Sequence, residues 1–235
     1  MRPDMPGSKS SGAEPPLEVR DRPMRIALTG GIASGKSTIA RMLAEKGAVI
    51  LDADEAARRA VRPGQPAWVR LREILGPDFF DPATGELKRR KLRERIIRDE
   101  ALRSRVNAAV HPAVLETMEA AWRDCCLREP TRPVIFDIPL LYEAKLEEAF
   151  DCVVLAYADP EIQVRRLHRR DGVSLEEARK TLTMQLPIQW KRRRAHVVID
   201  NSGDLESTRR QVDALWEKLM RRERLCRKDT PTTWS

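Results

Sequence analysis

Short apolar runs alternate along this chain with longer stretches in which apolar residues recur every three or four positions. The short runs are nearly continuous rather than alternating, which is typical of strands covered on both faces in a parallel sheet. The longer stretches are typical of amphipathic helices, which would pack on the two faces of that sheet. We therefore predict an α/β fold with a five-stranded parallel sheet flanked by helices, its strands formed by residues 25–29, 48–52, 133–137, 152–157 and 196–200.

Local signals mark the ends of several helices. Gly47 suits the C-terminal end of the helix that follows the first strand. The sequence SLEE fits a capping box and predicts a helical segment that begins at Ser174 and stops before Pro187. Asp204 suits the N-cap of the closing helix.

The connection between the second and third strands is too long to be a simple crossover. It contains about 80 residues, where an ordinary connection needs far fewer. Amphipathic patterns over residues 67–75 and 92–122, with a turn at 81–85, predict helices instead of a loop. We predict that residues 61–129 form a helical insertion and that the core comprises residues 24–60 and 130–220.

Both ends of the chain differ in composition from the rest. Residues 1–23 are rich in proline, serine and glycine, and they carry four basic and four acidic residues. We expect a disordered leader here, and Met24 is a candidate translation start because it precedes the first strand. We expect residues 221–235 to be a loose basic tail.

Charge narrows the classes of partner. Lys and Arg number 44 against 36 Asp and Glu, a net charge of +8, which fits nucleic acid, a membrane surface or phosphorylated small molecules. The basic runs at 88–95 and 221–228 contain none of the aromatic residues that single-strand-binding surfaces use for stacking. No apolar run approaches the roughly 20 residues of a membrane span. We expect a cytoplasmic protein with no nucleic-acid or membrane partner.

The cysteines and histidines are scattered along the sequence. Four cysteines and three histidines show no paired spacing of the kind that zinc sites use. We therefore expect reduced cysteines and no metal held by His or Cys.

A glycine-rich segment after the first strand carries the clearest chemistry. Gly30, Gly35, Lys36 and Ser37 fit G-x-x-x-x-G-K-[ST] between a predicted strand and a predicted helix, a context that disfavours a chance glycine-rich turn. Such a loop turns backbone N–H groups toward phosphate oxygens, and the helix N-terminus adds partial positive charge. We expect Lys36 to contact the terminal phosphates of ATP and Ser37 to complete the coordination of Mg²⁺. The predicted ATP-binding residues are Gly30, Ala33, Ser34, Gly35, Lys36, Ser37 and Thr38.

Three aspartates follow the second and third strands. Ligands of open α/β sheets bind at this edge. We interpret Asp52 as a structural helix cap and Asp54 as the candidate general base, although either would serve as a cap. Asp137 stands where a carboxylate would orient Mg²⁺, and a turn residue at the strand end is the alternative.

Arginines after the fourth strand suggest a lid over residues 160–190. Arg166 and Arg170 are four positions apart and so share one helical face. Guanidinium groups stabilise the charge of a transferring phosphoryl group best when a mobile segment brings them over the site. A solvated helix surface is the competing interpretation, and it is stronger for Arg165 and Arg169.

Seven segments between about residue 24 and residue 219 form a pattern beyond the glycine-rich loop: RIALTGGIASGKST, VILDADEAAR, GELKRRKLRERI, VNAAVHPAV, FDIPLLYEAKLEEAFDCVV, ADPEIQVRRLHRRDG and HVVIDNSG. On these segments the chain resembles the dephospho-coenzyme A kinases. The aspartate pair, the HP pair and DIPLLYE are more specific than the glycine-rich loop. The resemblance implies a P-loop kinase fold and transfer of the ATP γ-phosphate to the ribose 3′-hydroxyl of dephospho-coenzyme A. We expect a monomer or weak homo-oligomer.

The same resemblance assigns candidate residues. Asp54 matches the catalytic aspartate of the family and also lies in its substrate site. In the family the helical insertion binds the coenzyme, so Arg89, His111 and Pro112 become candidate substrate contacts, although His111 would equally suit a helix start before Pro112.

This chain departs from the family pattern at two positions. Thr181 stands where family members often have an arginine four positions before Gln185, which removes one possible lid contact. Ile97 replaces a frequent Phe, a tolerated apolar change.

Two other functions compete with this one. A nucleoside or nucleotide monophosphate kinase would share the loop, sheet and lid, but the large basic insertion disfavours it. A nucleotide-gated switch would need a water-positioning or effector segment, and the sequence shows none that we recognise.

Overall fold

The computed structural model describes residues 24–221 and 232–233. The predicted leader, residues 1–23, lies outside the described residues, and so does most of the predicted tail, residues 222–231 and 234–235. Within the described part, no helix is both long enough and apolar enough to cross a membrane.

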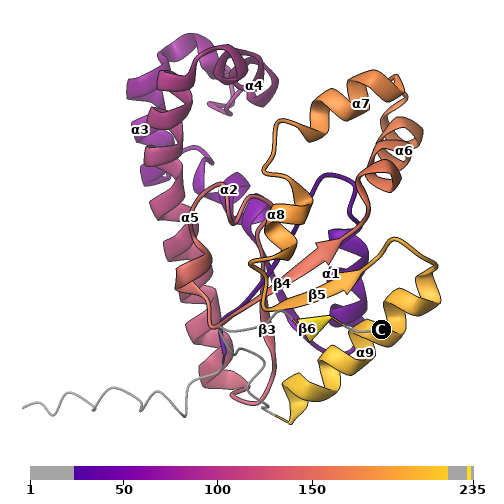
Figure 1. Cartoon of the computed structure of the whole chain (residues 1–235). Helices are drawn as coiled ribbons and strands as arrows, with labels where there is room; N and C mark the ends of the chain where they lie inside the picture. The colour runs from indigo at the N-terminus through magenta and orange to yellow at the C-terminus, as the bar shows by residue number, and fades with distance from the viewer. Residues whose placement is uncertain (1–23, 222–231, 234–235) are drawn as a thin grey trace, which may run out of the picture.

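A parallel sheet forms the centre of the molecule (Figure 1). Its strand order is β2-β3-β1-β4-β5-β6, and every neighbouring pair is parallel. Strands β1, β3 and β4 are buried along their whole length, which explains their continuous apolar sequences. The strands are β1 (Ile26–Gly30), β2 (Val49–Asp52), β3 (Val134–Asp137), β4 (Cys152–Tyr157), β5 (Val197–Asp200) and β6 (Thr232–Thr233).

The five predicted strands are confirmed as β1 to β5. The structure adds the two-residue β6, which pairs with β5 through Val197↔Thr232 and Val198↔Thr233. The expectation of a loose tail is therefore wrong at residues 232–233. Two threonines after a proline carry too weak a pattern to predict a strand, because the pairing with β5 alone defines it.

Helices cover both faces of the sheet. On one face α1 (Lys36–Glu45) and α9 (Leu205–Met220) pack against each other and on alternate residues of β1, β4 and β5. On the other face lie α2 (Ala53–Ala60), α8 (Ile188–Arg192) and the C-terminal half of a long helix, α5 (Glu100–Arg128). Asp204 caps α9 as expected, since its carboxylate accepts the Ser207 N–H at 2.6 Å.

The segment between α2 and β3 is helical, as predicted. It comprises α3 (Pro66–Leu75), the 3₁₀ turn η1 (Pro77–Phe79), α4 (Arg89–Arg98) and α5. These helices enclose a core of their own, which includes Leu71, Phe80, Leu92 and Val106. Helix α5 continues through His111 and Pro112, so a helix start at this pair is wrong.

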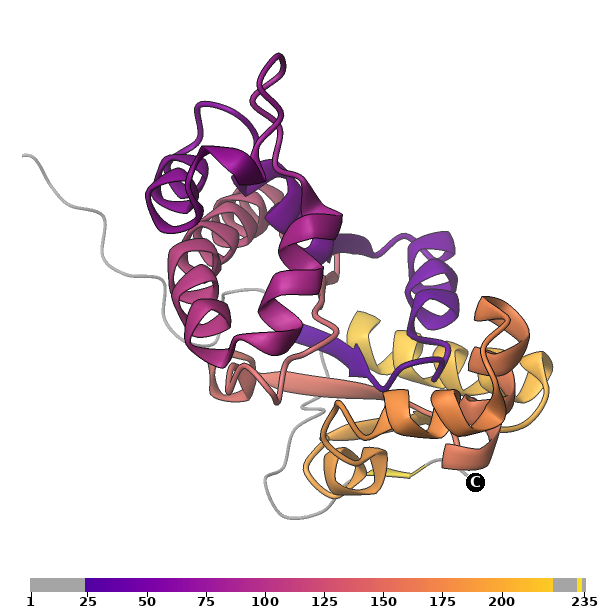
Figure 2. The same ribbon diagram turned by 90° about the horizontal axis from the view of Figure 1, so that it is seen from above.

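Two helical elements rise on opposite sides of the strand ends (Figures 1 and 2). On one side stands the insertion, with α4 at its far end, and on the other stand α6 (Pro160–Asp171) and α7 (Leu175–Leu182). The predicted capping box at Ser174 is confirmed, because its hydroxyl accepts the Glu177 N–H and the Glu177 carboxylate accepts the Ser174 N–H. We call α6, α7 and the residues between them the arm.

Candidate active site

The glycine-rich segment forms a loop between β1 and α1. The Ser34 N–H donates to the Gly31 carbonyl at 3.1 Å, and Ala33 and Gly35 both have positive φ, 58° and 89°. Helix α1 starts with no side-chain cap on its first N–H groups. N–H groups without a side-chain cap, at the positive end of the helix dipole, suit a bound anion.

Gly35 is required by its surroundings. A Cβ atom built on Gly35 would lie 1.8 Å from Asn201 Nδ2, a distance that no side chain allows. Its left-handed backbone also disfavours any other residue. The loop is therefore held close to the end of β5, where Asn201 lies.

Asn201 joins three elements of the site, and sequence reasoning missed it. The side-chain amide donates to the Ser34 carbonyl at 2.9 Å, and the backbone carbonyl accepts Arg166 Nη2 at 2.8 Å. The buried Thr208 hydroxyl donates to Asn201 Oδ1 at 2.9 Å, which orients the amide. The sequence did hold a signal for Asn201, since it is a polar residue directly after the fifth predicted strand. Ligands of such sheets bind at this edge, where the strands end.

The two lid arginines are in different environments. Arg166 Nη1 is buried without a hydrogen-bond partner among the described residues, and a Cβ atom built on Gly35 would lie 3.8 Å from it. Arg170 instead donates to both carboxylate oxygens of Asp171, at 2.7 and 3.0 Å, and this pairing raises the pKa of Arg170. The structure thus brings Arg166 to the phosphate loop and does not bring Arg170 there.

The two aspartates after β2 lie in different environments. Asp52 accepts the N–H groups of Asp54 and Glu55 at 2.7 and 3.1 Å, so its interpretation as a helix cap is confirmed. Asp54 is exposed in the first turn of α2, and its carboxylate makes no hydrogen bond or ion pair within residues 24–221. A free carboxylate at this edge suits contact with an acceptor hydroxyl.

Asp137 lies beside both β1 and β2 in the sheet, paired in register with Leu28 and Asp52. It is 6 % exposed and forms an ion pair with Lys36. Burial raises the pKa of Asp137 most, the attraction of Lys36 opposes that shift, and the nearby charges of Asp52 and Asp54 add to it. A buried carboxylate that forms an ion pair with the loop lysine makes Asp137 a candidate functional residue.

Ser37 and Asp137 are the candidate ligands for Mg²⁺. Ser37 is exposed in the first turn of α1, and Asp137 uses Oδ1 for Lys36 while Oδ2 accepts no hydrogen bond from the described residues. Mg²⁺ prefers oxygen ligands and usually keeps several waters, so one hydroxyl and one carboxylate fit it. Within the described residues no cluster of three or more His, Cys, Asp or Glu forms a dedicated metal cage.

Gln185 also contacts the phosphate loop. Its Oε1 accepts the Ile32 N–H at 2.9 Å, which ties the loop to the segment between α7 and α8. The arm touches the loop as well, because Ile32 and Ala33 pack against the core shared by α6 and α7. The loop is thus held from the lid side as well as from β5.

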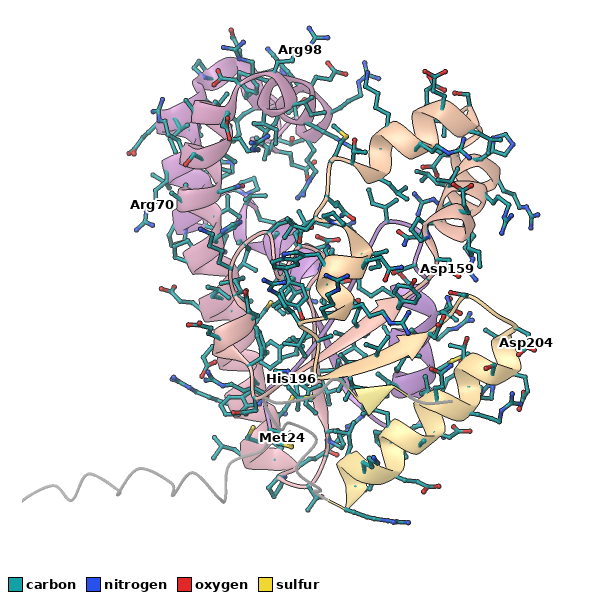
Figure 3. The ribbon with its side chains drawn as sticks, in the orientation of Figure 1. Met24, Arg70, Arg98, Asp159, His196 and Asp204 are labelled. Atoms are coloured by element: carbon teal, nitrogen blue, oxygen red, sulfur yellow. The ribbon has the colours of Figure 1, made fainter. Side chains whose placement is uncertain are left out.

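The candidate substrate residues lie in the insertion. Arg89 begins α4, and its Nη2 donates to the Arg58 carbonyl in α2, the helix that carries Asp54, at 3.3 Å. His111 and Pro112 are exposed in the middle of α5. Arg70 of α3, labelled in Figure 3, extends away from the strand ends.

Comparison with known proteins gives a consistent result. The family model described as dephospho-CoA kinase matches residues 24–207. A dephospho-CoA kinase of Geobacillus kaustophilus is 44 % identical over 83 % of this chain and 98 % of its own length, and one of Leifsonia xyli is 42 % identical over the same shares.

Solved structures share the fold. The Thermus thermophilus protein TT1252 superposes with a TM-score of 0.71 at 33 % identity, over 84 % of this chain and 98 % of its own. A dephospho-CoA kinase from Campylobacter jejuni gives a TM-score of 0.64 at 20 % identity, over 84 % and 97 %.

Proposed function

This chain belongs to the dephospho-CoA kinase family, and we propose on that basis that it phosphorylates the ribose 3′-hydroxyl of dephospho-CoA with ATP, forming CoA and ADP. The observation that carries this proposal is the match over residues 24–207, because that range includes the phosphate loop, Asp54, the insertion and the arm. A phosphate loop alone would leave any P-loop kinase open.

We propose that the phosphate loop binds the triphosphate of ATP. The N–H groups at the start of α1, which have no side-chain cap, and the Lys36 ammonium would contact the β- and γ-phosphates, within a loop formed by Gly30, Ala33, Ser34, Gly35, Ser37 and Thr38. The buried and unpartnered Arg166 Nη1 supports a role for this arginine in stabilising charge on the transferring group. For Arg170, this role requires that its pair with Asp171 breaks when the arm closes.

In the chemical step, Asp54 accepts the proton of the 3′-hydroxyl. The hydroxyl oxygen then forms a bond to the γ-phosphorus while the bond from that phosphorus to the bridging β,γ-oxygen breaks, and ADP leaves. The exposed carboxylate of Asp54, with no partner within residues 24–221, supports this role.

Ser37 and Asp137 would hold Mg²⁺, which when bound neutralises charge on the β- and γ-phosphates. Lys36 now pairs with Asp137 and would turn toward the nucleotide phosphates as they bind. The two partners therefore keep each other's charge balanced in the nucleotide-free protein.

We propose that the insertion binds the coenzyme portion of the substrate through Arg89, His111 and Pro112. The contact of Arg89 with α2 supports this, because it holds the basic end of α4 next to the helix that carries Asp54. A guanidinium group at this place suits an anionic substrate.

One activity panel tests the proposed function. The purified full chain is incubated with ATP and Mg²⁺ and with dephospho-CoA, nucleosides or nucleoside monophosphates, and ADP release is followed, with Lys36→Ala as the inactive control. We expect rapid release only with dephospho-CoA. Release with a monophosphate instead would favour a nucleotide kinase, and equal release without any acceptor would favour a nucleotide-gated switch.

A further inference from the structure

The segment between α7 and α8, residues 183–187, is fixed at two neighbouring positions. Gln185 Oε1 accepts the Ile32 N–H of the phosphate loop at 2.9 Å. The next residue, Leu186, donates its N–H to Glu143 Oε1 at 3.1 Å. One turn of chain thus contacts the phosphate loop on one side and the segment after β3 on the other.

Glu143 is itself held by a buried lysine. Lys191 on α8 is completely buried, and its Nζ lies 2.7 Å from Glu143 Oε1. Beside this pair, Tyr142 packs edge-on against Trp190, with ring centroids 5.6 Å apart. Glu143 lies six residues after Asp137, the candidate Mg²⁺ ligand at the end of β3. The Glu143–Lys191 ion pair therefore joins α8 to the segment that follows β3.

Stability alone does not explain a fully buried lysine here. Burying the Lys191 ammonium group beside the half-buried Glu143 carboxylate costs more solvation than one ion pair usually restores, and an apolar pair of the same volume is often as stable. Glu143 Oε2 is also buried with no hydrogen-bond partner among the described residues, which adds to the cost. What the pair provides is one fixed acceptor for the Leu186 N–H.

We propose that Glu143 and Lys191 are positioning residues of the nucleotide site, which hold Leu186 so that Gln185 fixes the phosphate loop through Ile32. They touch neither nucleotide nor acceptor. Their effect on the loop passes through Gln185, and the inference rests on the proposed binding of ATP by that loop.

Two paired variants separate charge from positioning. Glu143→Gln with Lys191→Met removes both charges but keeps a side-chain oxygen for the Leu186 N–H, whereas Glu143→Leu with Lys191→Met removes the acceptor as well. We expect the leucine pair to weaken binding of a non-hydrolysable ATP analogue about tenfold, the effect of one lost hydrogen bond in the positioning chain. We expect the glutamine pair to bind it within about twofold of the wild type.

A double-mutant cycle tests whether the effect passes through Gln185. Gln185→Ala should weaken analogue binding by itself, and the leucine pair should add little in that background, because the connection is already broken. As a control, Lys46→Met with Asp213→Leu removes an ion pair of 2.5 Å between the end of α1 and α9 and should leave analogue binding unchanged.

Wild-type affinity in the leucine pair, or an effect fully additive with Gln185→Ala, would overturn the inference. If the leucine pair does not fold, amide hydrogen exchange of the nucleotide-free wild-type protein decides: slow exchange at both Ile32 and Leu186 supports the inference, and fast exchange at either overturns it. If the wild-type protein itself fails to bind the analogue, the proposed function fails instead.

Discussion

The negative charge of Asp137 is unfavourable in the folded protein. Burial outweighs the attraction of Lys36, so the pKa of Asp137 is raised above 3.8, its ordinary value. The folded protein therefore holds this proton to higher pH than the unfolded chain does. As pH rises from the ordinary pKa of the carboxyl group to the raised one, ionisation of Asp137 progressively lowers the free energy of unfolding. This destabilisation is complete at neutral pH.

We predict that Asp137→Asn is more stable than the wild type at pH 7. The amide has nearly the same shape and still accepts a hydrogen bond from Lys36, but it carries no charge to desolvate. The stability advantage should shrink as pH falls toward 3.8, because Asp137 then becomes neutral in the wild type as well. Thermal unfolding of both proteins over a pH series checks this, and a variant less stable at pH 7 would contradict it.

Asp54→Asn should reduce turnover far more than nucleotide affinity. A general base contributes about 10²–10⁴ in rate, while the exposed position of residue 54 leaves the loop untouched. Steady-state turnover and the Kd for an ATP analogue are measured together. Glu55→Gln, which changes the neighbouring carboxylate, is the matched control, and equal turnover of Asp54→Asn and the wild type would exclude the base role.

Residue roles could be predicted from the sequence where local chemistry decides them. The cap Asp52 acts within its own turn, and its place directly before a predicted helix identified it. Motif spacing identified Gly35, but not the approach of Asn201 that also requires a glycine there. Asn201 and the different environments of Arg166 and Arg170 depend on partners from other elements. Helical spacing placed the two arginines on one face but carried no information on the competing Asp171.

At the scale of elements, α9 supports the phosphate loop through Asn201. Thr208 in its first turn is completely buried and donates to Asn201 Oδ1, so the amide nitrogen faces the Ser34 carbonyl. Thr208→Val should cost about 1–3 kcal/mol of stability, because it leaves a buried amide oxygen unpaired. It should also weaken binding of an ATP analogue, and Thr208→Ser should restore most of it.

Two measurements together distinguish a positioning role of Thr208 from a role in stability alone. Analogue affinity and Tm are measured for the valine and serine variants under the same conditions. A loss of Tm with unchanged affinity in Thr208→Val would show that α9 serves the fold alone.

Elements were predictable where hydrophobic pattern and caps agreed. Helices α1, α7 and α9 each had a cap signal, at Gly47, Ser174 and Asp204, beside their apolar residues. The strands β1 to β5 were predicted from their continuous apolar runs alone. The sequence pattern did not separate α4 from α5, because the apolar spacing continues across Asp99. Only the Asp99 carboxylate, which accepts the Leu102 N–H, marks the start of α5. Pro112 was a misleading signal, since α5 tolerates it on an exposed face.

At the scale of the whole molecule, α5 connects two hydrophobic cores. Its 29 residues span about 43 Å. Val106 and Ala109 belong to the core of the insertion, while Val114 and Met118 belong to the core on the sheet. The sequence predicted the insertion because the connection between the second and third strands is long and has helical patterns. It could not predict that one helix belongs to both cores, since that depends on where the faces of the helix meet other elements.

This arrangement predicts separable effects on the two substrates. Leu71 is completely buried in the core of the insertion, and Leu71→Ala should cost about 2–5 kcal/mol locally. We expect a raised KM for dephospho-CoA with little change in the Kd of an ATP analogue, because the phosphate loop is held by β5, α9 and the segment before α8 instead. Amide exchange should accelerate in α3, α4 and the first half of α5 and stay slow in β1 and β4. Equal acceleration in the sheet would contradict this prediction, because the insertion and the core would then unfold as one cooperative unit connected by α5.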